Sequence, residues 1–406
     1  MVQTQFYTST AIPVPIKATK VARIESIDLL RGGVMIIMAL DHVRDFFHHD
    51  VYYYDPTDLT QTTPILFFTR FITHFCAPVF VFLAGTAAFL SGRKKTKKEL
   101  SLFLVTRGIW LVFLEMFILS LIKSFNPTYP YFNLQVIWAI GFSMIFLAAL
   151  IHLNKFYIFI IGLILVFGHN LLDNVHVAGD GIASFLWSFL HEQKLFNLGY
   201  FSFFLNYPVL PWIGIMALGY CAGSLFVIHE KSRKKILMWM GISAIFLFIL
   251  LRIGNLYGDP HPWSIQGDAV YSFLSFINVT KYPPSLQYAL ITLGPALLFL
   301  SFAEKPLRQI GEKVAVFGRV PMFYYLAHFL LIHSFASIAG VLTGYPEIVV
   351  LNKSIFRTPE LQGYGFNLLS VYLIWIGLVL LLYPICKWYD QYKRANLEKY
   401  PWLSYL

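Results

Sequence analysis

Long, continuously apolar runs dominate this chain. About ten of them contain roughly 20 residues each, which is the length that a helix needs to cross the hydrocarbon core of a bilayer. Membrane-spanning β-strands would instead alternate apolar and polar residues, whereas a helix satisfies its own backbone hydrogen bonds in lipid. Only 13% of the 406 residues are charged, about half of the share in a soluble domain. The sequence therefore predicts an all-α, polytopic membrane protein and excludes a water-soluble enzyme.

Hydropathy places the expected spans along most of the chain. They lie near residues 28–48, 64–92, 101–124, 133–152, 155–173, 208–228, 235–252, 284–303, 314–342 and 365–387. The sequence contains no internal repeat and no linker to a soluble domain. We therefore expect one transmembrane domain at 25–390, with a polar N-terminal tail at 1–24 and a C-terminal tail at 391–406.

Basic residues are distributed unevenly between alternate loops. One set of loops carries most of them, including clusters at 93–98 and 231–235. The opposite set carries only Lys123, Lys194, Lys281, Lys353 and Arg357. By the positive-inside rule, the first set and both termini are cytoplasmic. The net charge of +10 then reflects topology, so no nucleic-acid partner is expected. In a bacterium the protein would lie in the cytoplasmic membrane.

The external loops near 174–207 and 253–283 are rich in aromatic residues, and their apolar runs are too short to span. We expect these loops to lie along the membrane interface or to fold back over the helices. The cysteines Cys76, Cys221 and Cys386 all fall within expected spans and lack the paired spacing of a metal site. No disulfide and no bound metal are therefore expected.

The first expected span contains an unusual density of ionisable residues. They are Asp28, Arg31, Asp41, His42, Arg44, Asp45, His48 and His49. Such groups are costly in lipid, so they usually face the interior of a bundle or mark a reactive site. Helical spacing places Asp28 beside Arg31 near the cytoplasmic end, and Asp45 beside His42 in the outer half. A solvated helix end is the alternative for the last three residues.

Three blocks of sequence resemble those of a known family. Residues 25–32 (ESIDLLRG) and 38–47 (MALDHVRDFF) resemble the start of the catalytic domain of the heparan-alpha-glucosaminide N-acetyltransferase family. Residues 74–85 (HFCAPVFVFLAG) resemble the second span of that family, and 317–329 (FGRVPMFYYLAHF) resemble a late span of its bacterial members. Arg31 followed by His42 is also similar to the signature of the wider acyltransferase-3 superfamily.

The resemblance implies a membrane enzyme. It would take an acetyl or other acyl group from cytoplasmic acyl-CoA and pass it to an amine or hydroxyl of an extracytoplasmic carbohydrate. The superfamily spacing points to His42 as the catalytic residue, while the closer family points to His48 or His49. Where that family has an asparagine in its first span, this chain has His42.

The residue types agree with this chemistry. Acyl transfer from a thioester needs a base for the attacking amine or hydroxyl, and a neutral imidazole can serve. We expect Asp45 or Asp41 to orient the His42 ring. His74, Asn170 or an arginine would stabilise the developing oxyanion. The sequence shows no activated serine or cysteine, so direct transfer is preferred, and an acyl-histidine intermediate is left open.

The anionic donor acyl-CoA should meet basic groups at the cytoplasmic mouth. Arg31, Arg319 and His328 are the candidates for binding it. The alternative function is a multi-span transporter of a small polar or anionic solute, although transporters more often contain two related halves. A non-catalytic scaffold would not need so many ionisable groups in one span. The sequence leaves open the acceptor, the acyl length and the formation of a homodimer.

Overall fold

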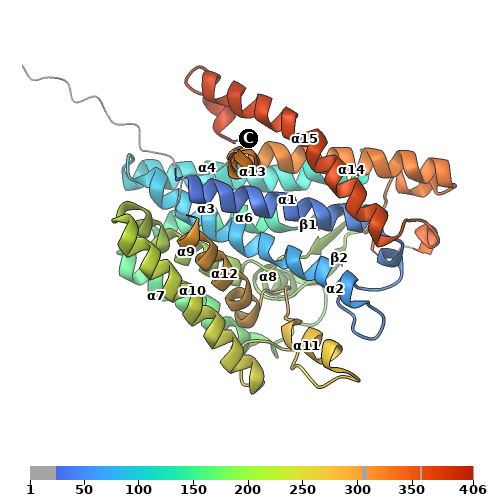
Figure 1. The fold of residues 1–406 in the computed structure, drawn as a ribbon, viewed down its shortest axis with the longest axis horizontal. Helices are drawn as coiled ribbons and strands as arrows, with labels where there is room; N and C mark the ends of the chain where they lie inside the picture. Colours follow the sequence, from blue (N-terminus) through green and yellow to red (C-terminus); the bar gives the residue numbers. More distant parts are fainter. Residues whose placement is uncertain (1–23, 304–308, 357–358, 406) are drawn as a thin grey trace, which may run out of the picture.

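The computed structural model describes residues 24–303, 309–356 and 359–405. Its helices form a bundle, with a small sheet near the C-terminal end of α1 (Figure 1). The α-helices are α1 (Glu25–Phe47), α2 (Pro64–Phe71), α3 (Cys76–Gly92), α4 (Lys97–Phe113), α5 (Ser120–Ser124), α6 (Val136–Leu150), α7 (Lys155–Gly168), α8 (Ile182–Leu190), α9 (Leu210–Ala222), α10 (Glu230–Ile253), α11 (Ala269–Ile277), α12 (Leu286–Phe302), α13 (Gln309–Arg319), α14 (Pro321–Thr343) and α15 (Leu368–Asn396). The expected N-terminal tail, apart from Ile24, and the loop cation Arg357 lie outside the described residues.

Seven helical segments among the described residues are long and apolar enough to cross a membrane. They are Pro64–Gly92, Lys97–Ser124, Lys155–Leu172, Leu210–Val227, Glu230–Ile253, Pro321–Thr343 and Leu368–Asn396. The helices α6 and α12 are apolar but shorter, and α1 has 23 residues but carries several charges. The mostly helical membrane architecture is therefore confirmed, whereas the count of about ten spans and the cytoplasmic termini stay predictions.

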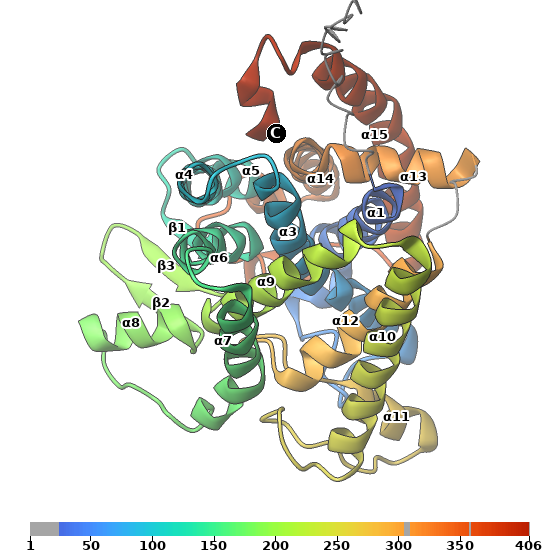
Figure 2. The same cartoon turned by 90° about the vertical axis from the view of Figure 1, so that its left-hand side faces the viewer.

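One expected span is wrong. Hydropathy predicted a single helix over 314–342, but the structure has two helices, α13 and α14, which meet at Val320. Pro321 explains the break, because proline disfavours helical backbone at the residue before it, and Val320 adopts φ −127° and ψ 50°. Figure 1 views α13 almost along its axis while α14 runs across the picture, and Figure 2 shows the reverse. The two helices therefore meet at a steep angle, and only α14 can span.

Small residues let α1 and α13 cross in close contact. A Cβ atom on Gly32 would lie 2.0 Å from the carbonyl oxygen of Val314, and one on Gly318 would lie 2.0 Å from that of Asp28. Arg31 adds a hydrogen bond from Nη1 to the Gly318 carbonyl at 3.2 Å. Packing of this kind is the main attraction between helices in lipid, where burial of apolar surface gives little. The crossing therefore fixes α1 in the bundle.

We expect Gly32→Ala to destabilise the protein and Gly33→Ala to leave it as stable or slightly more so. The added methyl at position 32 collides with backbone, which costs about 1–3 kcal/mol, whereas a Cβ on Gly33 has no neighbour within 4 Å among the described residues. Both changes remove a glycine from the same helix, so the helix-propensity gain cancels in the comparison. Thermal unfolding in detergent measures the difference, and equal midpoints would contradict the packing argument.

The segments before α6 and between α8 and α9 build a three-stranded sheet, which the all-α expectation did not include. Its order is β1–β3–β2, with strands β1 (Tyr131–Leu134), β2 (Lys194–Asn197) and β3 (Ser202–Leu205). β1 runs parallel to β3, and β2 runs antiparallel to it. Alternate residues Phe132, Leu134, Phe196 and Leu205 are buried together in a local apolar cluster. The loop near 174–207 thus folds back against the helices, which was one of the two alternatives expected from the sequence.

Candidate active site

A cavity of about 390 Å³ lies beside the C-terminal half of α1, and we call it the outer cavity because the loop charges predict that this half is extracytoplasmic. We call its lining from α1, α2, α3, α6 and α14 the floor and its lining from the connecting segments the wall. Its lining includes Met38, Asp41, His42, Arg44, Asp45, Asp55, Arg70, Phe80, Gln135, Val136, Gln193, Asn206, Tyr207, Lys281, Tyr282 and Tyr325. The cavity therefore combines several charged groups with aromatic walls.

Two carboxylates and two guanidinium groups form a buried charge network on the floor of the outer cavity. Asp41 Oδ1 lies 2.8 Å from Arg44 Nη2, and Asp41 Oδ2 accepts a hydrogen bond from Arg70 Nη1. Arg44 Nη2 also donates to Asp45 Oδ1 at 2.6 Å. Nε and Nη1 of Arg44 are buried and have no hydrogen-bond partner among the described residues. Arg44 therefore combines two unsatisfied donors with a position in the lining of the outer cavity.

His42 is the histidine that the structure places in the outer cavity, and its side chain is 16% exposed. Its Nδ1 lies 3.8 Å from Asp45 Oδ2, which is longer than a hydrogen bond but close enough for a small rotation to make one. The ring packs against Phe329, with 4.2 Å between centroids. Asp41 is held by Arg44 and Arg70, so Asp45 is the better placed carboxylate to orient His42.

Two other predicted histidines lie near this centre without lining the outer cavity. His328 is fully buried, 5.4 Å from His42 between ring centroids, and its Nδ1 lies 3.0 Å from the Tyr324 carbonyl of its own helix. His74 lines a neighbouring cavity of about 320 Å³, which shares Arg70 with the outer cavity. His328 is thus buried beside His42 and does not line the outer cavity. The structure shows no direct route by which acyl-CoA could contact His328 as predicted.

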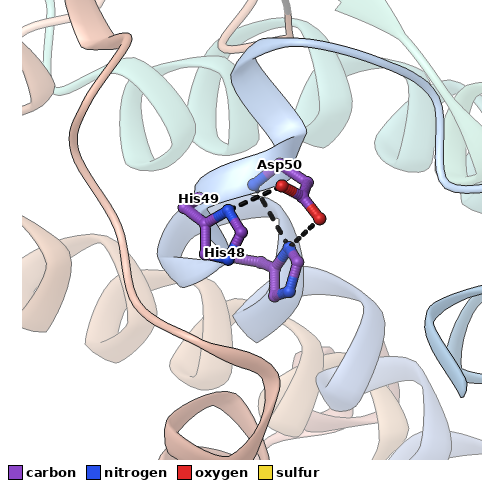
Figure 3. A group of neighbouring side chains, drawn as sticks. All are labelled: His48, His49 and Asp50. Carbon is purple, nitrogen blue, oxygen red and sulfur yellow. Dashed lines mark hydrogen bonds and ion pairs between the residues drawn. The ribbon is translucent and has the colours of Figure 1, made fainter. Parts of the chain in front are cut away.

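The alternative catalytic histidines lie just beyond the end of α1 (Figure 3). The His48 ring stacks on His49 with centroids 4.6 Å apart, and its Nδ1 accepts the backbone N–H of Asp50 at 3.3 Å. His49 Nδ1 lies 2.6 Å from Asp50 Oδ1, and the His49 side chain is half exposed. Neither ring is among the residues that line the outer cavity. These three consecutive residues satisfy one another locally, so the geometry favours His42.

Asp55, in the segment between α1 and α2, adds a negative charge to the outer cavity. Burial alone would raise the pKa of the Asp55 carboxyl, but the nearby Arg70 guanidinium and hydrogen bonds from Thr57 lower that pKa below its usual value. Thr57 donates its backbone N–H at 2.8 Å and its hydroxyl at 2.7 Å. The carboxylate is therefore ionised at neutral pH and available to an acceptor amine or hydroxyl.

A second cavity, of about 230 Å³, lies toward the other end of α1, and we call it the inner cavity. Most of its lining is apolar, but Arg31 and Arg107 both reach it. Arg107 Nη1 donates to the carbonyl of Ser404 at 2.9 Å, so the C-terminal turn Pro401–Tyr405 packs beside this cavity. The part of the chain expected to be a tail thus continues α15 and then returns to α4.

Arg319, the third residue predicted to bind acyl-CoA, has a different environment. Its Nε donates to Asp390 Oδ2 at 2.7 Å, and Arg394 pairs with the same carboxylate at 2.9 Å. Arg319 is not among the residues that line the inner cavity. The structure therefore joins α13 to α15 through Arg319 and leaves Arg31 and Arg107 as the cations at the inner cavity.

The inner and outer cavities are separated by a thin wall. Phe80, Val136 and Tyr325 line both of them. These residues come from α3, α6 and α14, so three helices that are distant in sequence meet at this point. The two cavities are therefore adjacent in the bundle.

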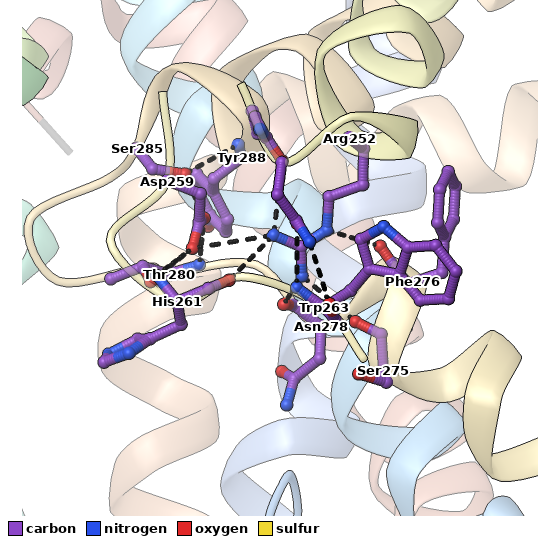
Figure 4. Close-up of polar contacts among 12 residues, drawn as sticks. Arg252, Asp259, His261, Trp263, Ser275, Phe276, Asn278, Thr280, Ser285 and Tyr288 are labelled. Carbon is purple, nitrogen blue, oxygen red and sulfur yellow. Dashed lines mark hydrogen bonds and ion pairs between the residues drawn. The ribbon is translucent and has the colours of Figure 1, made fainter. Parts of the chain in front are cut away.

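Arg252 holds the loop between α10 and α12, which contributes Lys281 and Tyr282 to the lining of the outer cavity (Figure 4). Its side chain is 1% exposed, and it donates hydrogen bonds of 2.6–3.0 Å to the carbonyls of His261, Ser275, Phe276 and Asn278. Asp259 completes the same cluster by accepting hydrogen bonds from Thr280 and Ser285. The buried Arg252 guanidinium thus connects the segment after α10, which contains His261, to the C-terminal end of α11 at Asn278.

We expect Arg252→Met to open this loop. The variant loses the hydrogen bonds that the guanidinium donates and leaves buried carbonyl groups unpaired. The free energy of local loop opening should therefore fall by at least about 2 kcal/mol, which raises the open population about 30-fold. Trypsin cleavage after Lys281 measures the change. Lys235→Met, at an exposed position near the other end of α10, is the matched control. Equal cleavage rates for both variants would show that Arg252 does not hold the loop.

The comparison with known families decides the affiliation of the chain. The model of the heparan-alpha-glucosaminide N-acetyltransferase catalytic region matches residues 23–255, which is more than half of the 406 residues. The chain belongs to this family. The curated proteins contain no match. Membership of the heparan-alpha-glucosaminide N-acetyltransferase family implies a transmembrane acetyltransferase with acetyl-CoA and carbohydrate substrates.

The region that matches the N-acetyltransferase family, residues 23–255, begins just before α1 and ends just after α10. It contains His42, Asp45 and the charge network, together with both arginines of the inner cavity. His328, Arg319 and the loop cation Lys281 lie outside it. The sequence match therefore covers the part of the outer cavity that α1, α2, α3 and α6 line, whereas Lys281, Tyr282 and Tyr325 come from the C-terminal part.

Two residues near this site were missed as site candidates from sequence. Arg107 reaches the inner cavity, and Lys123 lines a small cavity of about 80 Å³ that also contains His42. Lys123 Nζ donates to Glu115 Oε1 at 2.8 Å and to Gln135 Oε1 at 2.6 Å. Arg107 lies within the expected third span, where an ionisable side chain is itself a signal of function, but the sequence does not indicate its partner. Lys123 was counted among the loop cations, so the sequence offered no such signal for it.

Proposed function

We propose that this protein transfers an acetyl group from cytoplasmic acetyl-CoA to an amine or hydroxyl of an extracytoplasmic carbohydrate, with His42 as the base. The donor would enter through the inner cavity, where Arg31 and Arg107 would bind its phosphates. The acceptor would enter the outer cavity. The positive-inside distribution of the loop charges supports this orientation, because the basic loops lie on the side of Arg31.

One observation carries the proposal. His42 lines the outer cavity, and Phe80, Val136 and Tyr325 line both this cavity and the inner one. A flexible pantetheine arm that enters from the inner cavity could therefore bring a thioester to His42 when Phe80 and Tyr325 rotate. The apolar lining of the inner cavity suits the arm, while the arginines suit the anionic end of the donor.

The proposed step needs no group beyond donor, acceptor and protein. The acceptor nitrogen or oxygen forms a bond to the thioester carbonyl carbon while a ring nitrogen of His42 takes its proton. Asp45 stabilises the imidazolium that forms, and the free N–H groups of Arg44 stabilise the oxyanion. The carbon–sulfur bond then breaks, and the imidazolium returns the proton to the CoA thiolate. In the alternative path, a His42 nitrogen itself receives the acetyl group before the acceptor does.

Transfer is tested with purified protein in sealed proteoliposomes. Labelled acetyl-CoA is supplied on one side, and glucosamine or methyl glucoside, as amine and hydroxyl acceptors, on the other. The expected result is labelled N- or O-acetyl sugar in the acceptor compartment, with CoA released on the donor side. Labelled protein formed without acceptor would favour the acyl-histidine path. Accumulation of unmodified sugar with no acetylated product would overturn the proposal in favour of the transporter.

A further inference from the structure

A group of three side chains on the external side has the geometry of a metal site. His169 and Asp173 lie in the turn at the end of α7, and His191 lies at the end of α8. His169 Nδ1 is 3.2 Å from His191 Nε2, which is 3.7 Å from Asp173 Oδ1. All three candidate ligand atoms lie within 4.8 Å of one another. None of these residues takes part in the proposed transfer.

We propose that His169, Asp173 and His191 bind one divalent transition-metal ion of the Zn²⁺ class. A tetrahedral zinc ion with ligands at about 2.0–2.2 Å separates neighbouring ligand atoms by roughly 3.4 Å, and the two measured separations bracket this value. A hydrogen bond between the two rings accounts for the 3.2 Å contact but not for the position of Asp173. The 3.7 Å separation from Asp173 is too long for a hydrogen bond, and His191 Nε2 already faces another ring nitrogen.

The surroundings hold the three ligands in place. His169 and His191 are only 2% and 3% exposed, so the surrounding residues restrict the rotamers of both side chains. Asn170 donates to Asp173 Oδ2 at 2.8 Å and accepts the backbone N–H of Leu286 at 2.9 Å. This is the role of an outer-shell group, which orients a coordinating carboxylate. The Trp187 ring stacks on His191 with centroids 5.4 Å apart. Three protein ligands would leave a fourth position for water.

The site would connect the folded-back loop to the bundle. His169 belongs to the end of a membrane helix, whereas His191 precedes β2. Gln193, two residues after His191, donates to the Asn206 carbonyl at 3.0 Å, and both residues line the outer cavity. A bound cation would therefore hold the wall of that cavity. This consequence rests on the proposed function, but metal binding itself does not.

Metal content tests the proposal. Protein carrying no polyhistidine tag is stripped with chelator, equilibrated with Zn²⁺ or Co²⁺, and desalted. We expect about one ion per chain and, with Co²⁺, the intense visible absorption of a tetrahedral centre. His191→Gln and Asp173→Asn should lower the affinity at least about 100-fold, and Asn170→Ala, outside the ligand set, about 10–100-fold. His176→Gln, whose ring is 70% exposed on the same loop, should bind as the wild type does.

Two results would overturn the metal site. One is wild-type protein that retains no Zn²⁺ and gives no tetrahedral Co²⁺ spectrum, which does not depend on any variant folding. The other is equal metal content in the wild type, His191→Gln and Asp173→Asn. Acetyl transfer is measured separately on the same samples. Transfer by protein that binds no metal rejects only the metal site, whereas metal binding without transfer rejects only the proposed function.

Discussion

Replacement of His42 by alanine is expected to lower acetyl transfer about 10²–10⁴-fold, which is the usual contribution of a general base. Binding of acetyl-CoA should change little, because the inner cavity that would hold the donor does not include His42. The loss should therefore appear in kcat, with KM for the donor nearly constant. Turnover at saturating labelled acetyl-CoA, together with a separate donor-binding measurement, checks both parts.

Two kinds of variant make this result interpretable. His176→Gln, on the exposed part of the outer loop, controls for the general loss of an imidazole. His48→Gln and His49→Gln separate the candidate catalytic histidines. If either of these abolishes transfer while His42→Ala retains it, the base has been wrongly assigned and the site lies at the end of α1. If all three retain transfer, no histidine of the first span is the base.

Asp41→Asn is expected to destabilise the protein by about 3–5 kcal/mol, because it leaves two buried guanidinium groups without their shared carboxylate. The side chains of Arg44, Asp41 and Arg70 are only 2%, 10% and 13% exposed, so solvent screens the network weakly. The amide keeps the shape of the carboxylate and removes its charge. A lower midpoint of thermal unfolding in detergent measures the effect.

A paired change shows whether charge is the cause. Asp41→Leu combined with Arg70→Met replaces one buried pair by apolar side chains and should recover part of the loss, since apolar groups of similar volume often substitute for a buried ion pair. Asp180→Asn, at a side chain that is 75% exposed, should have almost no effect. If Asp41→Asn is no more destabilising than Asp180→Asn, the network does not stabilise the fold.

Much of the bundle could be predicted because the length of an apolar run is a local property. Each of the seven candidate spans overlaps an expected one. The exception at 314–342 arose because hydropathy averages over a window and does not register that Pro321 reorients the chain at Val320. The sheet was missed for a related reason: β1, β2 and β3 have four residues each, and β1 pairs with a strand distant in sequence.

The candidate site was predictable in part. The ionisable residues of the first span could be singled out, because burial of charge is costly wherever the partner lies. Their pairing could not be read from helical spacing alone. Asp41 pairs with Arg70 of the second span as well as with Arg44 of its own helix. Arg319 was expected at the donor site but contacts Asp390 on α15, which no spacing within α13 or α14 indicates.

The sequence by itself determined a helical membrane protein with reactive groups in its first span, since run length and the cost of burying charge act on each segment alone. Only the tertiary structure decided that His42 lines a cavity, that Phe80 and Tyr325 line both this cavity and a second one, and that His169 meets His191. These relations join helices distant in sequence. They arise from close packing, in which each side chain takes the space and partners that neighbouring helices leave to it.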